Sequence, residues 1–253
     1  MSMKISKRKR PEREEKPFKE RLKITGKALD DPTLMVLVGF LNGKVIKSVD
    51  YPISSGKEAV VFRATTPKGG YLAVKVFKYE TSAFRHMGEY IEGDPRFRNV
   101  KRQKRPLVKE WASKEFANLR KATEAGIPCP APLARKENVI LMEFIGEGGR
   151  PYALLNEVIL EDPQAVFDEL MAAVRKSYEV KLVHGDLSPY NVMLALKDGR
   201  ERPVIIDWGT AVLLEHPRAR EFLERDVRTL CNFFKKHGVE CDEQAELQRV
   251  LKQ

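Results

Sequence analysis

The loop that decides the fold is Val183-His184-Gly185-Asp186-Leu187-Ser188-Pro189-Tyr190-Asn191, which an apolar run follows at 192–196. It holds an aspartate, Asp186, and an asparagine, Asn191, at the two ends of one short segment. Such an aspartate can accept or orient the proton of an attacking hydroxyl, and an asparagine carbonyl can bind magnesium. The loop therefore predicts a phosphotransferase. That enzyme also needs a phosphate-covering loop, a lysine on a strand and a second carboxylate for the metal.

The composition is ordinary for a soluble globular protein, with 42% hydrophobic and 32% charged residues among 253. This length allows one large domain or two lobes around a shared cleft. No apolar run approaches the roughly 18 residues of a membrane span. The basic N-terminus lacks the apolar segment of a secretory signal. Three cysteines, Cys129, Cys231 and Cys241, fit neither a disulfide framework nor a zinc site, so a reducing cytoplasm is expected.

A net charge of +10 favours polyanionic partners such as ATP and RNA. Basic residues gather in the tail at 4–10 and again at 96–105. A basic net charge is also common in proteins that never bind nucleic acid. The charge therefore leaves two alternatives open, a protein that contacts RNA and a basic protein that does not.

Turn residues and periodicity divide the chain into a sheet-rich first half and a helix-rich second half. Strands are expected at 45–53, 60–65, 71–77 and 139–144, with two short ones around the turn at 197–199. Helices are expected at 32–42, 107–125 and 163–178, with a fourth ending at Gly238 and a short one closing the chain. The first of these has Asp31-Pro32 as its cap and Leu34, Val38 and Leu41 as its apolar stripe. Residues 1–28 are predicted to form a mobile tail, and 79–105 shows no clear period.

Lys75 lies in an apolar strand, between Val74 and Val76. It is either an edge lysine that points to water or a lysine that reaches nucleotide phosphates from the sheet. Glu115 lies on the helix stripe of Trp111 and Leu119, which predicts that it faces inward, although a surface position is the alternative. An inward carboxylate and an inward lysine are both costly unless they are paired. Pairing Lys75 with Glu115 solves both problems.

Asp207 follows the apolar strand at 204–206 and precedes Trp208-Gly209. A carboxylate at a strand end beside a glycine turn can face a cleft and bind magnesium, or it can simply cap the turn. Residues 54–59, Ser-Ser-Gly-Lys-Glu-Ala, link two strands and could approach phosphates through backbone N–H groups. They match neither a Walker A loop nor G-x-G-x-x-G, and a hairpin turn is the better interpretation of the segment alone. Buried His184 is expected to support its loop and carry no proton.

The order and rough spacing of the candidate residues resemble those of the protein-kinase superfamily. These residues are Lys75, Glu115, the loop from His184 to Asn191, and Asp207. The details resemble the RIO family of atypical protein kinases, in the branch first described. Its shortened phosphate loop is similar to residues 55–59, its catalytic loop to 184–191, its metal loop to 206–207, and its flexible loop to 77–105. The similarity covers roughly residues 29–240.

This resemblance implies an α+β, two-lobed kinase fold: an antiparallel sheet with one main helix in the N-lobe (about 45–143), a hinge at 143–146, and a reduced helical C-lobe (about 146–253). Residues 29–253 would form the kinase domain, with the helix at 32–42 preceding the N-lobe. The implied ligands are ATP and Mg²⁺, with Mn²⁺ as a possible substitute. The implied catalytic residues are Asp186, Asp207, Lys75 and Glu115, and the metal ligands are Asn191 and Asp207. Nucleotide contacts would come from Ser54, Ser55, Gly56, Lys57, Glu58, Ala59, Lys75, Met142, Glu143 and Ile145.

RIO proteins are serine autokinases and ATPases in small-subunit ribosome maturation, and their metal-loop aspartate can itself take the phosphoryl group. The resemblance thus implies the pre-ribosomal small subunit, its RNA and the chain itself as partners, with no membrane. Gly185 stands where alanine is usual, Pro189 where glutamate is usual, and Trp208-Gly209-Thr210 replaces the common sequence. Because a proline near the asparagine is also similar to aminoglycoside and choline kinases, a small-molecule phosphotransferase remains an alternative. The other alternative is an ATP-gated RNA-binding assembly factor.

Overall fold

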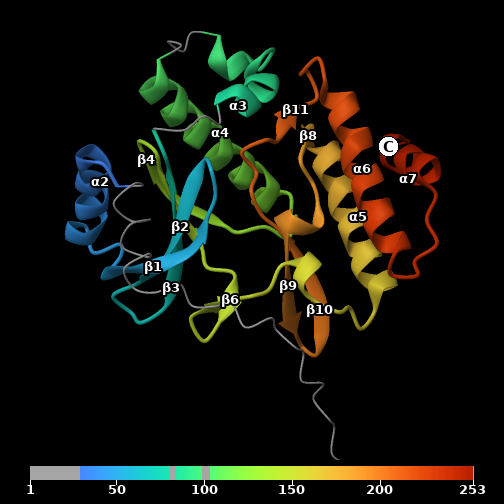
Figure 1. Ribbon diagram of the computed structural model, residues 1–253, viewed down its shortest axis with the longest axis horizontal. Coiled ribbons are helices and arrows are strands. Elements are labelled where there is room, and N and C mark those ends of the chain that lie inside the picture. The colour runs from blue at the N-terminus through green and yellow to red at the C-terminus, as the bar shows by residue number, and fades with distance from the viewer. Residues whose placement is uncertain (1–28, 80–83, 99–102, 253) are drawn as a thin grey trace, which may run out of the picture.

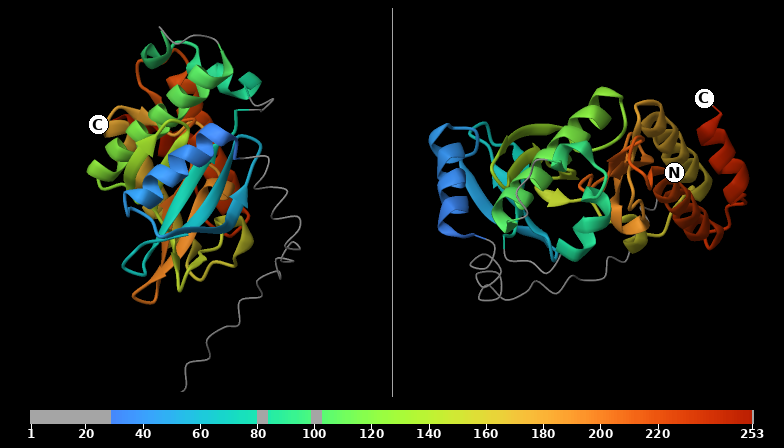
Figure 2. Two further views of the ribbon diagram at one scale, coloured as in Figure 1. Left: turned by 90° about the vertical axis from the view of Figure 1, so that its left-hand side faces the viewer. Right: turned by 90° about the horizontal axis from the view of Figure 1, so that it is seen from above.

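The computed structural model describes residues 29–79, 84–98 and 103–252. These residues form two lobes that lie side by side, a sheet-rich one built from the first half of the chain and a helix-rich one built from the second (Figures 1 and 2). The predicted tail at 1–28 lies outside the described residues. Within the described residues, no helix combines the length and the apolar character that crossing a membrane requires.

The N-lobe is built on a five-stranded antiparallel sheet. Its strands are β1 (Ser48–Ser55), β2 (Ala59–Thr65), β3 (Tyr71–Phe77), β4 (Pro132–Lys136) and β5 (Val139–Glu143), in the order β1-β2-β3-β5-β4. The predicted three-stranded meander is therefore confirmed, whereas β4 was not anticipated. Alternating residues send Phe62 and Val74 into an outer apolar cluster and leave Ala73 and Lys75 facing the other lobe.

Helix α2 (Asp31–Asn42) covers the outer face of this sheet (Figure 1). The predicted cap and stripe were both wrong. Asp30 is the N-cap and accepts the Thr33 N–H at 3.0 Å, so Asp31 is already helical. Leu34 and Val38 are exposed, and the buried stripe is Thr33, Val36, Leu37 and Phe40. Apolar residues lie on both faces of this helix, so periodicity alone could not decide which face meets the sheet.

The segment without a sequence period contains two short elements where it is described. Helix α3 (Phe84–Ile91) and the 3-10 turn η1 (Pro95–Phe97) precede α4 (Lys104–Glu124), which begins three residues earlier than predicted. Tyr90 and Phe97 are buried against Trp111 of α4, with ring centroids 6.4 and 6.5 Å apart. This packing holds residues 87–98 against α4.

The C-lobe follows a small unpredicted hairpin, β6 (Gly146–Glu147) and β7 (Arg150–Pro151). Its helices are α5 (Pro163–Glu179), α6 (Ala219–Lys235) and α7 (Glu243–Leu251), with 3-10 turns η2 (Leu155–Glu157) and η3 (Pro189–Asn191). Two short pairs complete it, β8 (Leu182–Val183) with β11 (Val212–Leu213), and β9 (Val192–Lys197) with β10 (Arg200–Ile205). The hairpin predicted around residues 197–199 is confirmed, and one apolar cluster joins these helices to α4.

Candidate active site

Lys75 of β3 lies between two carboxylates at the junction of the lobes. Its Nζ contacts both oxygens of Glu115, at 2.7 and 2.8 Å, and Oδ1 of Asp207, at 2.8 Å. Glu115 is 1% exposed at the side chain and Lys75 is 9% exposed, whereas Asp207 is 53% exposed. The predicted pair of Lys75 and Glu115 is present in the structure, and the edge-lysine and surface-glutamate alternatives are wrong.

Burial and countercharge act in opposite directions on this cluster. Burial disfavours the Lys75 ammonium, but the negative charges of Asp207 and Glu115 outweigh it and raise the pKa of Lys75. Burial also opposes ionisation of Asp207, yet Lys75 lowers the pKa of this carboxyl. Burial raises the pKa of Glu115 against the attraction of Lys75. The half-exposed carboxylate of Asp207 is therefore the member of the cluster that stays charged and faces the cleft.

The loop at 206–211, here called the Asp207 loop, is held from behind by α4. Asn118 Nδ2 donates to the carbonyls of Trp208 and Ala211, both at 2.9 Å. Lys114, which is fully buried, donates to the Gly209 carbonyl at 2.6 Å. Three side chains of one helix, at 114, 115 and 118, thus fix this loop and Lys75 together.

The short segment before α4 braces Asn118 in turn. Arg96 Nη1 donates to Asn118 Oδ1 at 2.9 Å, and buried Asp94 orients the Arg96 guanidinium through bonds of 2.6 to 3.1 Å. Burial, followed by the charge of Arg96, lowers the pKa of Lys114 to about 7. Arg96 belongs to the basic cluster at 96–105, but its guanidinium is bound to Asp94 and Asn118.

Asp207 has a left-handed backbone conformation, with φ at 63°. Aspartate tolerates this region better than bulkier residues, at a cost that surrounding contacts must offset. The bonds from α4 to the carbonyls on its C-terminal side supply such contacts. The conformation directs the Asp207 side chain toward Lys75 and not along the preceding strand.

The loop at 184–191, here called the Asp186 loop, brings its two polar ends together. Asn191 Nδ2 donates to the Asp186 backbone carbonyl at 2.7 Å and to Asp186 Oδ2 at 3.2 Å. This orientation leaves the Asn191 amide oxygen as the atom that can bind a cation. Desolvation and the nearby charge of Asp207 raise the pKa of Asp186.

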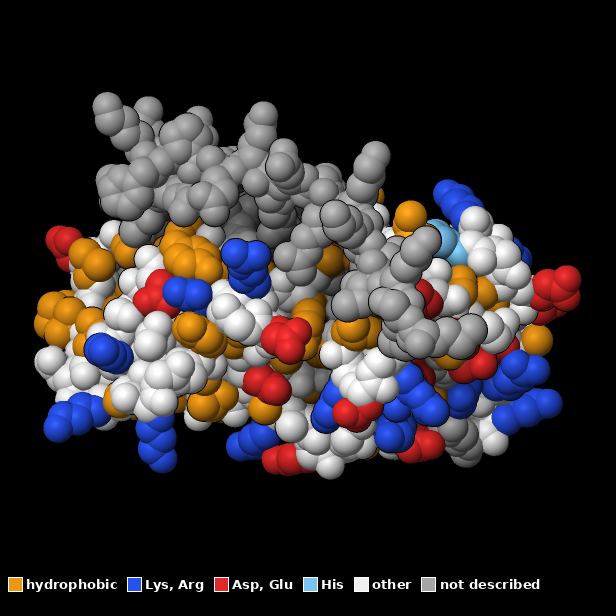
Figure 3. Space-filling model, turned by 90° about the horizontal axis from the view of Figure 1, so that it is seen from below, with side chains coloured by type: hydrophobic (Ala, Val, Ile, Leu, Met, Phe, Trp, Pro, Cys, Tyr) orange, Lys and Arg blue, Asp and Glu red, His pale blue; other side chains and the backbone are white. Residues whose placement is uncertain are grey.

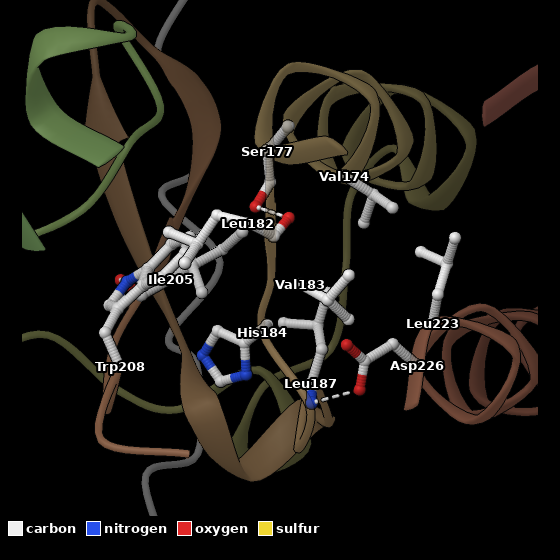
Figure 4. A pocket seen from close by; sticks show the side chains of 11 residues that line it. Val174, Ser177, Leu182, Val183, His184, Leu187, Ile205, Trp208, Leu223 and Asp226 are labelled. Carbon is white, nitrogen blue, oxygen red and sulfur yellow. Dashed lines mark hydrogen bonds between the residues drawn. The ribbon is translucent and has the colours of Figure 1, made fainter. Parts of the chain in front are cut away.

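Asp226 of α6 anchors this loop from below, beside a small cavity lined by α5, β8 and α6 (Figure 4). Its carboxylate accepts the N–H of Gly185 and that of Leu187, each at 2.8 Å. Burial raises the pKa of Asp226 to about 7. Gly185 has φ at 81°, and a β-carbon there would lie 3.0 Å from the Thr210 carbonyl. Glycine adopts this turn without the strain that a β-carbon would add there.

His184 joins the two loops as a neutral group. Its Nε2 lies 3.1 Å from the Ile206 carbonyl, and its Nδ1 accepts the Asp186 N–H at 3.4 Å. Desolvation lowers the pKa of His184 to about 4. The expectation that His184 props its loop without carrying a proton agrees with this geometry.

A cleft opens between the lobes in front of these groups. Its lining includes most of the residues predicted to touch a nucleotide: Ser54, Gly56, Lys57, Glu58, Ala59, Lys75, Met142, Glu143 and Ile145. Glu115, Asn191 and Asp207 also line it. Ser55 and Asp186 are not among the lining residues, although Asp186 contacts Asn191 at the rim. The loop at 54–59 is thus a strand connection that also faces the cleft.

Sequence reasoning missed the residues that hold this arrangement in place. Lys114 and Asn118 lie one residue before and three after Glu115, so helical spacing could have placed them near the inward stripe. Asp226 and Arg96 gave no signal of this kind, because Asp226 binds backbone atoms and Arg96 reaches Asn118, which is 22 residues further along the chain.

Comparison with known proteins identifies the group to which this arrangement belongs. A family model described as "RIO domain" matches residues 60–247. The RIO-type serine/threonine-protein kinase Rio1 of Haloferax volcanii is 40% identical over 223 residues, covering 88% of this chain and 76% of the relative. The corresponding protein of Methanocaldococcus jannaschii is 41% identical over 229 residues, covering 90% and 77%.

The chain belongs to the RIO family. It is an atypical kinase of the serine/threonine class and an ATP-dependent phosphotransferase. Its fold is similar to that of the Rio2 kinase from Chaetomium thermophilum, solved as an ADP/Mg²⁺–phosphoaspartate complex, with a TM-score of 0.66. At 24% identity, covering 84% of this chain and 64% of that one, this likeness concerns the fold alone.

The oxygen atoms at the cleft fit the magnesium that a kinase needs. Asp207 offers a half-exposed carboxylate, and Asn191 has its amide nitrogen turned to Asp186, which leaves a neutral oxygen beside it. Magnesium prefers hard oxygen ligands and usually takes one or two from protein, with phosphate and water supplying the rest. The pair Asn191 and Asp207 has this composition.

Proposed function

We propose that this RIO kinase binds ATP with Mg²⁺ in the cleft between its lobes and transfers the γ-phosphoryl group to a serine hydroxyl, including one of its own. The carrying observation is the position of Lys75, which links the sheet, α4 and Asp207 through three contacts of 2.7–2.8 Å. A lysine held in this way can reach phosphate oxygens from the sheet while Asp207 faces the same cleft.

Each polar residue then has a distinct task. Asp186 accepts or orients the proton of the attacking hydroxyl, and its raised pKa favours proton acceptance. Asn191 and Asp207 would hold Mg²⁺, which neutralises charge on the phosphates. The backbone of 54–59 would cover the phosphates, and Glu143 and Ile145 would bind the adenine edge. Positioning and charge neutralisation supply most of the acceleration in such a site.

ATP hydrolysis by way of Asp207 is the second part of the proposal. An Asp207 carboxylate oxygen attacks the γ-phosphorus, the bond to the β,γ-bridging oxygen breaks, and ADP leaves. Water, whose proton Asp186 accepts, then attacks the phosphorus of the acyl phosphate, which restores the Asp207 carboxylate and releases inorganic phosphate. The half-exposed carboxylate of Asp207 and the phosphoaspartate named for the Chaetomium thermophilum structure support this route.

One experiment separates these chemistries from each other and from small-molecule transfer. The protein is incubated with γ-labelled ATP and no other acceptor. Label on serine survives hydroxylamine, whereas an acyl phosphate on Asp207 is removed by it. Asp186→Ala should abolish serine labelling and phosphate release while ATP binding stays intact. Unchanged turnover in that variant, or label transfer only after an aminoglycoside or choline is added, would refute the proposal.

A role on the pre-ribosomal small subunit, with contact to its RNA, follows from the family and the basic charge, and it remains a prediction. Arg102 lies outside the described residues, while Lys104 is exposed at the start of α4. On the face shown in Figure 3, acidic side chains stand among the basic ones. RNA binding through phosphates should weaken steeply with salt and respond to charge reversal at Lys104. A flat salt response would count against it. The cytoplasmic location also stays a prediction.

A further inference from the structure

The hairpin β6–β7 follows the strand and linker (143–145) that lead from the N-lobe, yet one of its residues is buried. Glu147, Gly148 and Arg150 are exposed, whereas Gly149 is buried. Pro151, the last residue of the hairpin, and Tyr152, the next residue, line the cleft. The hairpin therefore lies at the mouth of the cleft, and the burial of Gly149 indicates that another part of the protein packs against it.

The partner of Gly149 is the N-lobe sheet. The Gly149 carbonyl accepts a hydrogen bond from Arg63 Nη1 at 3.0 Å and another from the Tyr51 hydroxyl at 3.2 Å. Arg63 lies on β2 two residues after Val61, on the same face of the sheet, and Val61 lines the cleft and is the cross-strand neighbour of Lys75. Arg63 thus extends from the sheet face that forms the cleft roof.

Aromatic rings hold the Arg63 guanidinium in place. Its carbon lies 4.5 Å from the Tyr51 ring centre and 4.6 Å from that of Tyr71, and its Nε donates to Asp50 Oδ2 at 2.9 Å. Tyr71 in turn contacts Phe144 of the linker, with centroids 5.8 Å apart. The arginine is therefore oriented in advance, and little conformational entropy is lost when it binds the hairpin.

We propose that this contact is a clasp: Arg63, as a positioning residue, ties the β6–β7 hairpin to the roof of the nucleotide cleft and thereby slows nucleotide release. The clasp rests on the proposed function, because it assumes that the nucleotide occupies this cleft. Moving the roof away from the cleft floor, which includes Tyr152 and Leu154, must stretch both bonds to the Gly149 carbonyl. Bonds from a charged donor are stronger than those from neutral donors, so opening is slowed while the clasp is intact.

Two adjacent glycines supply a matched pair of variants. Gly148 and Gly149 both have positive φ, at 56° and 76°, so alanine is strained at either position. A β-carbon at Gly148 meets nothing within 4 Å, whereas one at Gly149 would lie 2.5 Å from Arg63 Nη1 and 2.9 Å from the Tyr71 ring. Gly148→Ala therefore reproduces the backbone strain alone, and Gly149→Ala adds displacement of the arginine.

The test measures the dissociation rate of ADP that carries a fluorescent methylanthraniloyl group, by stopped flow with excess unlabelled ADP. Loss of one charge-assisted bond predicts release about tenfold faster in Gly149→Ala, and about twofold or less in Gly148→Ala. Arg63→Met should also accelerate ADP release, and Arg63→Lys should release ADP at a rate between those of wild type and Arg63→Met. Arg120→Met, which removes an exposed ion pair on α4, should leave the rate unchanged. Hydrogen exchange of residues 146–151 without nucleotide should rise in Gly149→Ala and Arg63→Met.

The outcomes separate the clasp from the proposed function. If wild-type protein does not bind the fluorescent ADP, the assignment of the cleft fails. If it binds and Gly149→Ala releases it no faster than Gly148→Ala, or Arg63→Met releases it at the wild-type rate, the clasp is refuted. If Gly149→Ala does not fold, Arg63→Met and its lysine counterpart decide the matter. If Arg63 had a structural role alone, Arg63→Met would lower the thermal stability and leave the rate of ADP release unchanged, and Arg63→Lys would release ADP at the same rate as Arg63→Met.

Discussion

Replacing Lys75 by methionine should destabilise the protein far more than the loss of a surface charge would. Glu115 is 1% exposed, so the substitution leaves a buried carboxylate without its cation. Removing one partner of a buried ion pair typically costs about 3–5 kcal/mol, because the remaining charge must be desolvated or neutralised. Asp207 adds little to this cost, since its half-exposed side chain can be solvated.

The double variant Lys75→Met/Glu115→Leu should recover most of that stability while remaining inactive. Two apolar side chains of similar volume replace the pair, and such exchanges are often neutral or stabilising. Urea denaturation followed by tryptophan fluorescence measures the free energies of unfolding, because Trp111 and Trp208 are both buried beside the cluster. Phosphate release from ATP reports activity. The two measurements separate the structural contribution of the pair from its role in catalysis.

A matched control is Lys109, which lies on α4, the helix of Glu115. Lys109 pairs with Glu137 at the surface, each 43% exposed, so Lys109→Met should cost less than about 1 kcal/mol. In Lys75→Met, the pKa of Glu115 should rise further, so this variant should regain stability relative to wild type as the pH falls. Two results would refute the reasoning. One is a free energy of unfolding for Lys75→Met/Glu115→Leu as low as that of Lys75→Met, and the other is a loss in Lys75→Met no larger than that in Lys109→Met.

Two further predictions concern the supports of the two loops, and a third concerns the proposed metal site. Asp226→Asn should remove a pH dependence: the folded pKa near 7 exceeds the ordinary 3.8, so the contribution of Asp226 to stability is complete below about pH 4 and is lost as the pH rises to 7. Urea titrations at several pH values should show this slope in wild type but not in the variant, which should also lose activity. Asn118→Leu removes the bonds of Asn118 to the Trp208 and Ala211 carbonyls and to Arg96 Nη1, while Arg96 keeps its bonds to Asp94. A buried polar group left without a partner costs about 1–3 kcal/mol, and equilibrium unfolding should show the loss. Asp207→Asn should weaken Mn²⁺ binding in the presence of ADP, measured by electron paramagnetic resonance, whereas Asp198→Asn in the distant β9–β10 turn should not.

Each of these outcomes has a contrary result. Equal pH slopes in wild type and Asp226→Asn would mean that Asp226 is ionised throughout. Stability of Asn118→Leu within about 0.5 kcal/mol of wild type, the usual range for a surface change, would mean that the Asp207 loop is held by other contacts. Equal Mn²⁺ affinity in Asp207→Asn and wild type would remove Asp207 from the proposed metal site.

The sequence by itself predicted the pairing of Lys75 with Glu115, because burying either charge alone is costly, and the structure adds Asp207 to this pair. Local rules also predicted the meander of β1 to β3 and the turn at 197–199, because strand alternation and turn residues act over a few positions. The stripe of α2 was predicted wrongly, since a helix with apolar residues on both faces is oriented only by the sheet it meets.

Only the tertiary structure decided what holds the residues of the candidate site in place. Asp226 binds backbone N–H groups of the Asp186 loop, and Asn118 binds backbone carbonyls of the Asp207 loop, some 90 residues further along the chain. Backbone atoms are the same at every residue, so no sequence pattern marks which of them a side chain will reach. The same holds for Arg63 and the Gly149 carbonyl. The types of the side chains can be read from the sequence, whereas the contacts that hold the two loops depend on distances that exist only once the chain has folded.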